Sequence, residues 1–321
     1  MPEPVTSIYP EGSPTISRVC VLGASGLVGT ALISSLLKAG VAVTAFSRTR
    51  RGDAAGLGHW DPAAGQIEAA RLEGADAVAN FAGANLGEGR WTAARKRELW
   101  ASRVDSTALL CRALAGLQRK PAVLVNASAV GFYGHRGDDA VYEDSPPGKG
   151  FLAELCEAWE AATEPAVAAG IRVVKMRFGV ILTPEGGVLA RMLPTFRHGL
   201  GGRFGGGEQR MPWIALADAV SATRFAMRHP DLAGPVNAVA PEPVTNAQLC
   251  DALAHALGKR APLPVPALAL KAMFGAEMAR ELLLTGANVR PRRLEITGYR
   301  FEYPRLEDAL EAMFGAQSGA G

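Results

Sequence analysis

Apolar and polar positions along the chain predict strands and helices that alternate. Arg18–Leu22 is an apolar run that ends in glycines, as a buried strand does, and Leu27–Ala39 then carries apolar residues at helical spacing. Further strands are predicted at Val41–Phe46, Ala75–Phe81, Ala122–Ala127 and Ile171–Arg177, with helices at about 91–117 and at Ala153–Ala169. This alternation predicts an α/β fold, a doubly wound parallel sheet of the Rossmann type built by right-handed crossovers.

The alternation ends after Leu182. Glycines crowd into His198–Gly207 and prolines into Pro262–Pro266, and later helices predominate. The helices are predicted at Ala217–His229, Asn246–Leu257 and about 267–284, with one strand at Pro235–Ala240. We therefore expect a loose tail at 1–16, a Rossmann domain at 17–182 plus about 213–240, and a smaller, helix-rich C-terminal domain at about 183–212 plus 241–315.

Composition narrows the classes of function. The 321 residues carry a formal charge of +3, so nothing demands a nucleic acid or an anionic membrane as partner. The four cysteines and five histidines are scattered, which argues against a disulfide framework and a metal site and suits a reducing compartment. No apolar run approaches the roughly 18 residues of a membrane span, and the first residues do not resemble a signal peptide. We expect a cytoplasmic monomer or homodimer.

A glycine motif marks the first strand–helix junction. Gly23, Gly26 and Gly29 belong to the run Gly23-Ala24-Ser25-Gly26-Leu27-Val28-Gly29, which follows the first strand and opens the first helix. The first glycine permits a tight turn, the second lets the backbone approach a pyrophosphate, and the third lets the helix pack closely on the strand. The helix N-terminus then offers free N–H groups and a positive dipole end. A dinucleotide site is favoured over a merely structural turn because of this placement.

The end of the second strand indicates which dinucleotide is bound. Ser47 and Arg48 stand where an NAD site usually has a carboxylate for the ribose 2′-hydroxyl, and Asp53 is the nearest acid. A hydroxyl and a guanidinium would instead bind the 2′-phosphate of NADP, the latter bidentately. The alternative is a solvated basic loop, since Arg50 and Arg51 follow. The position of Ser47 and Arg48 at the end of the second strand favours NADP over NAD.

With these residues the sequence resembles the atypical, extended short-chain dehydrogenase/reductases, and more closely the NADP-binding epimerase-family proteins related to nucleotide-sugar epimerases. The resemblance runs from Arg18 to about Phe314. Besides the glycine motif and Ser47-Arg48, its markers are Asn80-Phe-Ala-Gly83, Glu98, Ser102-Arg103, Asn126-Ala-Ser-Ala-Val-Gly-Phe-Tyr-Gly134, Arg177-Phe-Gly-Val-Ile-Leu182, Gly199-Leu-Gly-Gly202, Pro212-Trp-Ile214 and the tail Leu263–Tyr303.

The resemblance assigns further residues to the cofactor. It implies that the Asn80-Phe81-Ala82-Gly83 segment ends a strand beside the cofactor ribose, and that Val180 lies near the nicotinamide. Glu98 and Arg103 would face the adenosine end of NADP. The alternatives are a strand-capping turn for the first segment and a surface pair, five residues apart, for Glu98 and Arg103.

The usual catalytic residues of this superfamily are present only in part. A Ser or Thr and a Tyr-x-x-x-Lys pair usually carry the chemistry, with the tyrosinate as base and its pKa lowered by the lysine. Ser128 occupies the serine region, although the stretch to Gly134 is one residue longer than the common pattern. When Glu160 is aligned with the acid that commonly follows the lysine, Leu152 and Cys156 occupy the Tyr and Lys positions. Neither can serve as the base.

Substitutes for the missing pair can be named. Tyr133 follows Ser128 on the same loop and is a candidate acid or base, or else an aromatic wall for the substrate. The family's histidine position after Trp213-Ile214 is Ala215, and Asp218 is expected to cap the helix that follows.

Two functions from different classes follow from these residues. The leading hypothesis is an NADP(H)-dependent, epimerase-like oxidoreductase whose small polar substrate, for which a nucleotide sugar is one candidate, lies between the sheet's carboxyl ends and the C-terminal substrate domain. The alternative is a non-catalytic NADP(H)-binding sensor or scaffold, favoured by the missing Tyr/Lys pair. A nucleic-acid binder using the basic stretch 90–103 is disfavoured, because its charges alternate with apolar residues at helical spacing.

Overall fold

An eight-stranded sheet with the order β12-β8-β6-β5-β1-β2-β3-β4 forms the centre of the protein, in a computed structural model that describes residues 12–48, 56–260 and 263–315. Neighbouring strands are parallel except for the antiparallel pair β3 and β4. The strands are β1 Arg18–Leu22, β2 Ala42–Ser47, β3 Leu57–Asp61, β4 Gln66–Ile67, β5 Ala77–Asn80, β6 Val123–Ala129, β8 Arg172–Phe178 and β12 Gly234–Ala238.

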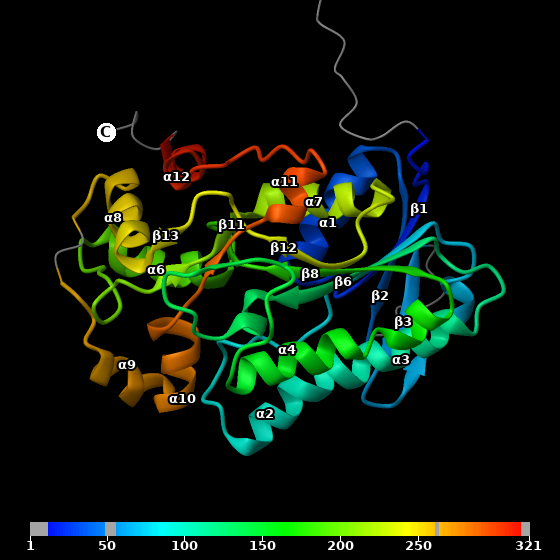
Figure 1. Cartoon of the computed structure of the whole chain (residues 1–321), viewed down its shortest axis with the longest axis horizontal. Coiled ribbons are helices and arrows are strands. Elements are labelled where there is room, and N and C mark those ends of the chain that lie inside the picture. The colour runs from blue at the N-terminus through cyan, green and yellow to red at the C-terminus, as the bar shows by residue number, and fades with distance from the viewer. Residues whose placement is uncertain (1–11, 49–55, 261–262, 316–321) are drawn as a thin grey trace, which may run out of the picture.

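Helices cover both faces of this sheet because successive strand side chains point to opposite faces. In β6, Val123 and Val125 pack into one buried cluster, whereas Leu124 packs into another on the opposite face. Figure 1 shows α1 Leu27–Lys38, α7 Leu216–Arg228 and α11 Arg292–Ile296 on one side, and α2 Ala93–Trp100, α3 Ser106–Ala115 and α4 Phe151–Ala161 on the other. The predicted fold class, a doubly wound α/β sheet of the Rossmann type, is confirmed.

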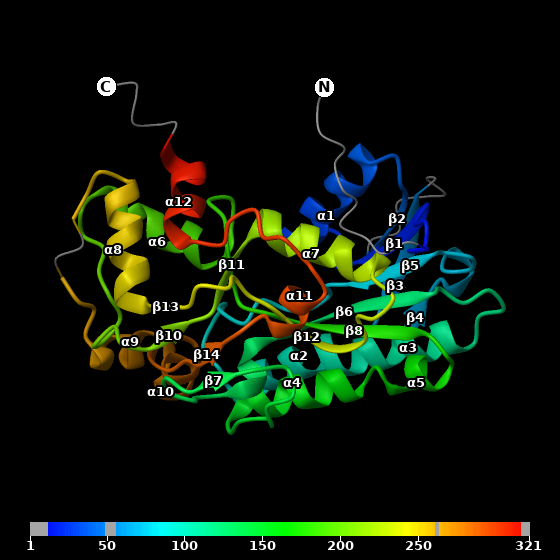
Figure 2. The same ribbon diagram turned by 45° about the horizontal axis from the view of Figure 1, so that its top comes forward.

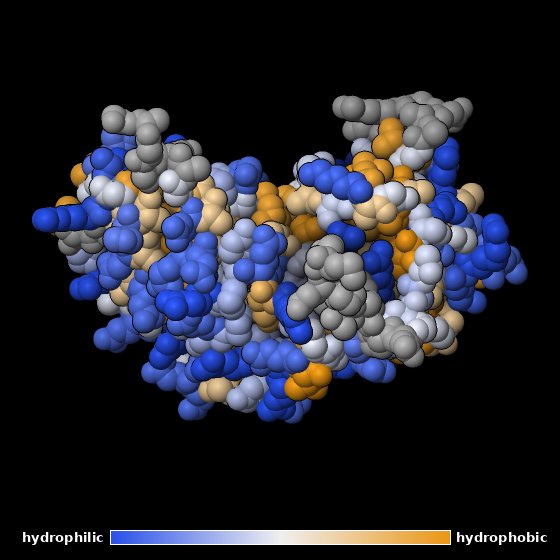
Figure 3. Space-filling view, turned by 90° about the horizontal axis from the view of Figure 1, so that it is seen from above, coloured by the Kyte–Doolittle hydropathy of each residue, from blue (hydrophilic) through white to orange (hydrophobic). Residues whose placement is uncertain are grey.

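A second group of elements lies beyond the carboxyl ends of the strands and has its own buried cluster (Figure 2). Its helices are α6 Gly187–Arg197, α8 Asn246–Ala256, α9 Ala267–Phe274, α10 Ala276–Ala279 and α12 Leu306–Phe314. Its short strands pair as β9 Val180–Leu182 with β11 Trp213–Ala215, β10 Arg210–Met211 with β13 Val244–Thr245, and β7 Ala140–Val141 with β14 Asn288–Val289. Seen from above, the surface is indented between the part that carries α8 and α12 and the part that carries α1 (Figure 3).

Three of the predicted helices are interrupted. The stretch predicted at 91–117 contains a π-helical turn, Ala101–Asp105, between α2 and α3. The helix predicted at 153–169 ends at Ala161, and a short helix α5, Glu164–Ala168, follows with Pro165 in its first turn. Gly275, with φ +89°, separates α9 from α10. Strands β3 and β4 were not predicted, because neither segment shows a clear alternation of apolar and polar residues.

Two further expectations need correction. Ile16 was placed in a loose tail, but its side chain is buried and belongs to the core cluster that includes α1 and α7. Asp218 does not cap α7: its carboxylate accepts hydrogen bonds from the Glu302 and Tyr303 backbone N–H groups and from the Tyr299 hydroxyl. The residue therefore fixes the C-terminal chain against the Rossmann sheet.

Two absences concern the part of the chain that the structure describes. None of the helices there has the length and apolar character needed to cross a membrane. Within the same residues, no three His, Cys, Asp or Glu side chains come together as a metal site would require.

Candidate functional site

The turn between β1 and α1 has no room for side chains at two of its glycines. Gly23 has φ +72°, and a Cβ there would lie 2.5 Å from the carbonyl carbon of Phe81. A Cβ on Gly29 would lie 2.2 Å from the Gly23 oxygen. The turn is closed by a hydrogen bond of 3.0 Å from the Gly26 N–H to that same oxygen. The sequence motif therefore has the physical basis expected: a tight turn, with helix and strand in close contact.

The N-terminus of α1 is open toward solvent. Gly26 is its N-cap, no side chain caps the helix, and no acidic residue lies in its first turn. Ser25 and Gly26 are exposed, whereas Gly29 is buried against the strand. The first-turn N–H groups thus have no intrahelical partner, and the positive end of the helix dipole is not neutralised by a carboxylate. These features fit a pyrophosphate.

The carboxyl end of β2 carries the residues predicted to choose between NADP and NAD. Ser47 is half-buried and ends the strand, and Arg48 beside it is exposed. Arg50, Arg51 and Asp53 lie outside the described residues. Cofactor choice at this point stays a prediction.

Asn80 shapes the backbone that follows β5. Its buried side-chain Nδ2 donates to Asn126 Oδ1 at 2.8 Å and to the Thr107 hydroxyl at 3.1 Å. Its own Oδ1 accepts from the Ala82 N–H at 3.2 Å. The side chain therefore acts as the strand-capping turn that was the alternative for this residue, while the Phe81–Gly83 backbone runs beside the glycine turn.

Arg103 is a buried cation that has no acidic partner among the residues the structure describes. It lies on the π-helical turn, is 7% exposed, and donates from Nη2 to the Ala84 carbonyl at 2.9 Å. Its Cζ lies 5.3 Å from the Trp159 ring centroid, and a Cβ on Gly83 would lie 3.2 Å from Cζ. Burial lowers the pKa of Arg103 to about 10. Among the described residues no carboxylate is within ion-pair distance, so an anion beside Gly83 would be favoured.

Glu98 has a different environment from Arg103. Its carboxylate pairs with Arg95 at 2.6 Å, and its side chain is 59% exposed. The two residues predicted to face the same end of the cofactor therefore do not pair with each other. The roles of Glu98 and Arg103 toward the cofactor stay predictions, and the structure supports an anion site at Arg103 alone.

Ser128 is held in a buried ionic network. The side chain is 3% exposed and its hydroxyl donates to Glu160 Oε1 at 2.7 Å. Arg177 binds the same carboxylate through two nitrogens, at 2.7 and 2.8 Å. The Ser128 proton is directed into the protein, so the hydroxyl does not offer it to a substrate in this arrangement.

Tyr133 belongs to the same network. Its ring is fully buried, its hydroxyl donates to Asn237 Oδ1 at 2.6 Å, and it accepts from Arg177 Nη1 at 2.8 Å. Burial raises the pKa of Tyr133 to about 12, although the Arg177 charge opposes the shift. A role for Tyr133 as acid or base stays a prediction that this geometry does not favour.

The positions of the missing pair are apolar and filled. Leu152 and Cys156 are buried on α4, and a Cβ on Gly131 would lie 3.2 Å from the Leu152 Cβ and 3.8 Å from the Cys156 sulfur. Both side chains therefore face the loop after Ser128, as the alignment of Glu160 predicts. Burial raises the pKa of the Cys156 thiol to about 12, so it stays protonated at neutral pH.

The second group of elements reaches the Rossmann half at several points that the sequence did not indicate. The Glu281 carboxylate accepts from the Phe151 and Leu152 N–H groups at 3.3 and 3.0 Å, and so caps α4. Val180, predicted to lie near the nicotinamide, is on β9 of the second group, where it pairs with Trp213 of β11 and its N–H donates to the Pro212 carbonyl at 2.7 Å; its role toward the cofactor stays a prediction. Glu281 could not have been found from local sequence, because 129 residues separate it from Leu152.

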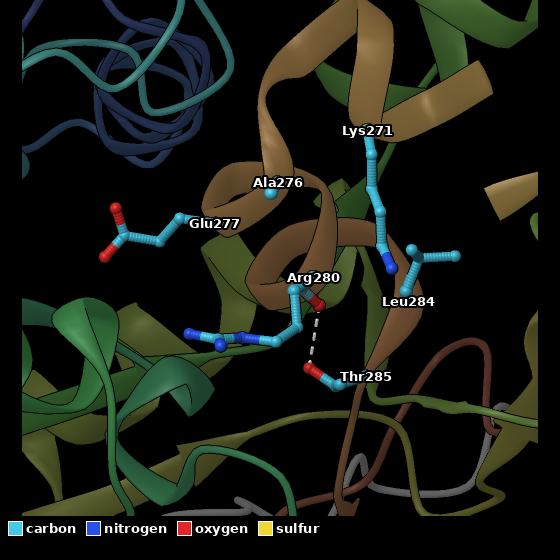
Figure 4. Close-up of a pocket in the computed structure, with 6 residues that line it drawn as sticks. All are labelled: Lys271, Ala276, Glu277, Arg280, Leu284 and Thr285. Carbon is cyan, nitrogen blue, oxygen red and sulfur yellow. Dashed lines mark hydrogen bonds between the residues drawn. The ribbon is translucent and has the colours of Figure 1, made fainter. Parts of the chain in front are cut away.

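An open cavity of about 600 Å³ lies in the C-terminal segment. Lys271, Glu277, Arg280 and Thr285 contribute polar groups to it, together with the apolar Ala276 and Leu284 (Figure 4). Glu277 is paired with Lys96 of α2 at 2.5 Å, which joins the cavity wall to the helix that also carries Glu98. The lining thus combines charged and apolar groups.

Known proteins match both halves of the chain. A model described as the NAD dependent epimerase/dehydratase family matches residues 19–239, and a domain of unknown function (DUF1731) matches residues 265–313. An epimerase family protein of Mycobacterium bovis, Mb2239, is 44% identical over 292 residues, which cover 91% of this chain and 96% of that protein.

Two solved structures extend the comparison. The human epimerase family protein SDR39U1, crystallised with NADPH, has a TM-score of 0.85 and 35% identity, and the match covers 93% of this chain and 99% of that one. A nucleoside-diphosphate sugar epimerase from Corynebacterium glutamicum has a TM-score of 0.76 and 33% identity, with 94% of this chain and 59% of that chain covered.

Proposed function

Because the chain belongs to the NAD dependent epimerase/dehydratase family, we propose that it is an NADP(H)-binding protein whose cofactor lies across the carboxyl ends of β1, β2 and β5. The observation that carries this proposal is the turn at Gly23–Gly29, which excludes side chains next to an uncapped helix N-terminus. The human SDR39U1 structure, determined with NADPH, supports NADP rather than NAD, as do Ser47 and Arg48.

In this proposal each part of the site has one task. The α1 N-terminus holds the pyrophosphate, Ser47 and Arg48 hold the 2′-phosphate, and Arg103 supplies positive charge beside Gly83. NADPH, when bound, supplies hydride chemistry. The elements after Leu182 form the substrate side, except for residues 213–240, which return to the Rossmann domain.

We further propose an epimerase-like oxidoreductase that acts on a small polar substrate without a Tyr/Lys proton relay. Leu152 and Cys156 then exclude water from the pocket wall rather than move protons. The charged cavity around Lys271 and Arg280 supports a polar substrate. The cytoplasm remains the proposed location, since the four cysteines are free and buried.

The second candidate, a non-catalytic NADP(H) sensor, is favoured by the burial of the Ser128 and Tyr133 hydroxyls in internal hydrogen bonds. Cofactor binding is common to both candidates, and only turnover separates them.

The test begins with fluorescence titration of NADPH and NADH, followed by turnover with carbonyl compounds and nucleotide sugars. NADPH is expected to bind at least ~10-fold tighter than NADH, a difference of about 1.4 kcal/mol.

Ser128→Ala should leave NADPH affinity nearly unchanged, and the Leu152→Tyr, Cys156→Lys double variant rebuilds the usual pair at i, i+4. Turnover by the wild type supports the enzyme. No turnover by the wild type with intact NADPH binding supports the sensor, and turnover gained only in the double variant would show that the lost pair is what the sensor lacks.

A further inference from the structure

The segment between β5 and α2 is fixed at both ends, and side chains from both halves of the molecule bind its middle. At its start, Ala84 N–H donates to the Ser102 hydroxyl at 3.0 Å, and its carbonyl accepts from Arg103. At its end, the Trp91 ring packs edge-on against Phe151, with centroids 5.1 Å apart. Between these anchors lie residues 85–89, which we name the clasp loop. Gly87 and Gly89 give it backbone freedom, Gly89 with φ +70°.

One hydrogen bond connects the clasp loop to the second group of elements. Arg191 of α6 donates from Nη1 to the Gly87 carbonyl at 2.6 Å. Two other side chains bind the loop, and both belong to the Rossmann half: Arg95 of α2 donates to the Asn85 carbonyl at 2.6 Å, and Trp91 Nε1 donates to the Leu86 carbonyl at 3.0 Å. Within the described residues, Arg191 makes the single hydrogen bond that reaches residues 85–89 from beyond the sheet's carboxyl ends.

Helix α6 also touches the opposite wall of the cofactor site. It begins at Gly187, and a Cβ on the preceding Gly186 would lie 3.1 Å from Leu27 Cδ1, at the start of α1. Arg191 is one helical turn further on, about 6 Å along the axis. The helix therefore runs from the glycine turn on one wall to the segment after β5 on the other.

From this arrangement we infer that the Arg191–Gly87 hydrogen bond is a clasp that joins the two walls of the cofactor site and must open for NADP(H) to enter or leave. The inference rests on the proposed cofactor site. The bond is suited to opening, because Arg191 is exposed and the loop it holds contains two glycines. A gate that is closed with and without ligand slows both binding and release.

The test uses stopped-flow NADPH binding and release with the full chain. Arg191→Met keeps the apolar stem and removes the donor, and Gly87→Ala puts a Cβ 2.8 Å from Arg191 Nη1 and displaces the guanidinium. Both variants should raise the association and dissociation rates about 10-fold, as expected for one charged hydrogen bond, with Kd changed less than ~3-fold. Arg197→Met, at another exposed arginine of α6, is the matched control and should leave both rates unchanged.

A second readout needs no cofactor. Amide hydrogen exchange of residues 85–89 in the free protein should quicken about 10-fold in Arg191→Met and not in Arg197→Met. Unchanged exchange and unchanged rates in both clasp variants would overturn the inference. So would faster release without faster binding, which would make Arg191 a cofactor ligand. Failure of the wild type to bind NADPH would instead refute the proposed function. The hydrogen-exchange measurement would then still show whether the Arg191–Gly87 bond restrains residues 85–89.

Discussion

The glycine turn and the β6–β8 network lie at the same edge of the sheet and are built in opposite ways. At the turn, side chains are excluded and the first-turn N–H groups of α1 face solvent without a cap. At the ends of β6 and β8, Ser128, Glu160, Arg177 and Tyr133 bind one another and are buried. Unsatisfied donors are available to a ligand, whereas satisfied ones stabilise the fold. The difference shows that the backbone of the glycine turn is open to a ligand, whereas the polar side chains of the β6–β8 network are occupied by one another.

The largest expected effect concerns the buried ion pair. Arg177→Met leaves the Glu160 carboxylate buried without its partner and should lower the free energy of unfolding by about 3–5 kcal/mol, measured by urea unfolding. The Arg177→Met, Glu160→Gln double variant should be less destabilised than the single one, because no bare charge remains. If both variants unfold at the same urea concentration as the wild type, the network does not stabilise the fold.

The next effect concerns the turn. Gly26→Val places a branched side chain where the backbone should approach the pyrophosphate, and NADPH affinity should fall at least ~100-fold, about 2.8 kcal/mol. The fold should be retained, since Gly26 is exposed with φ −78°. Gly116→Ala on α3, where a Cβ meets nothing closer than 3.6 Å, is the control for a glycine replacement. A folded Gly26→Val protein with normal NADPH binding would place the cofactor elsewhere.

A smaller effect sharpens the choice of cofactor. Arg48→Ala should remove most of the preference for NADPH over NADH, a change of about 10-fold or 1.4 kcal/mol in fluorescence titration. Arg119→Ala, an exposed arginine on the far end of the sheet, should keep the preference. Equal losses of NADPH and NADH affinity in Arg48→Ala would show that the residue does not read the 2′-phosphate.

The smallest effect lies at the margin of the network. Glu143 accepts from the Asn237 and Arg293 N–H groups through Oε1, while its buried Oε2 has no hydrogen-bond partner in the described part of the chain. Burial raises the pKa of Glu143 above its ordinary 4.5. The folded state therefore holds this proton more tightly, so its contribution to stability is complete below pH 4.5 and is lost as pH rises through the folded pKa.

Glu143→Gln keeps the Oε1 acceptor and removes the charge. At pH 7 it should raise Tm by on the order of 1–2 °C, and the gain should disappear at acidic pH, as scanning calorimetry would show. A lower Tm at pH 7 would mean that the ionised carboxylate stabilises this part of the fold.

Local sequence was sufficient for the elements that depend on short-range pattern. The strands near Cys20, Val78 and Val125 and the helix after Gly26 occur where apolar spacing predicts them. The interruptions were missed, because a π-helical turn at Ala101–Asp105 keeps helical spacing on both sides. The pair β3–β4 was missed because a short strand is fixed by its neighbour in the sheet rather than by its own residues.

The sequence by itself determined the turn that suits a dinucleotide and the loss of the Tyr/Lys pair, since both are matters of which side chains are absent. A missing Cβ or a missing ionisable group has the same consequence in any fold that places the motif at a strand end. Only the tertiary structure decided what the remaining polar groups do. Ser128, Glu160 and Arg177 come from three elements, and Glu281 reaches α4 from a distant segment. Their hydrogen bonds depend on ångström-scale distances that folding sets and that no local pattern encodes.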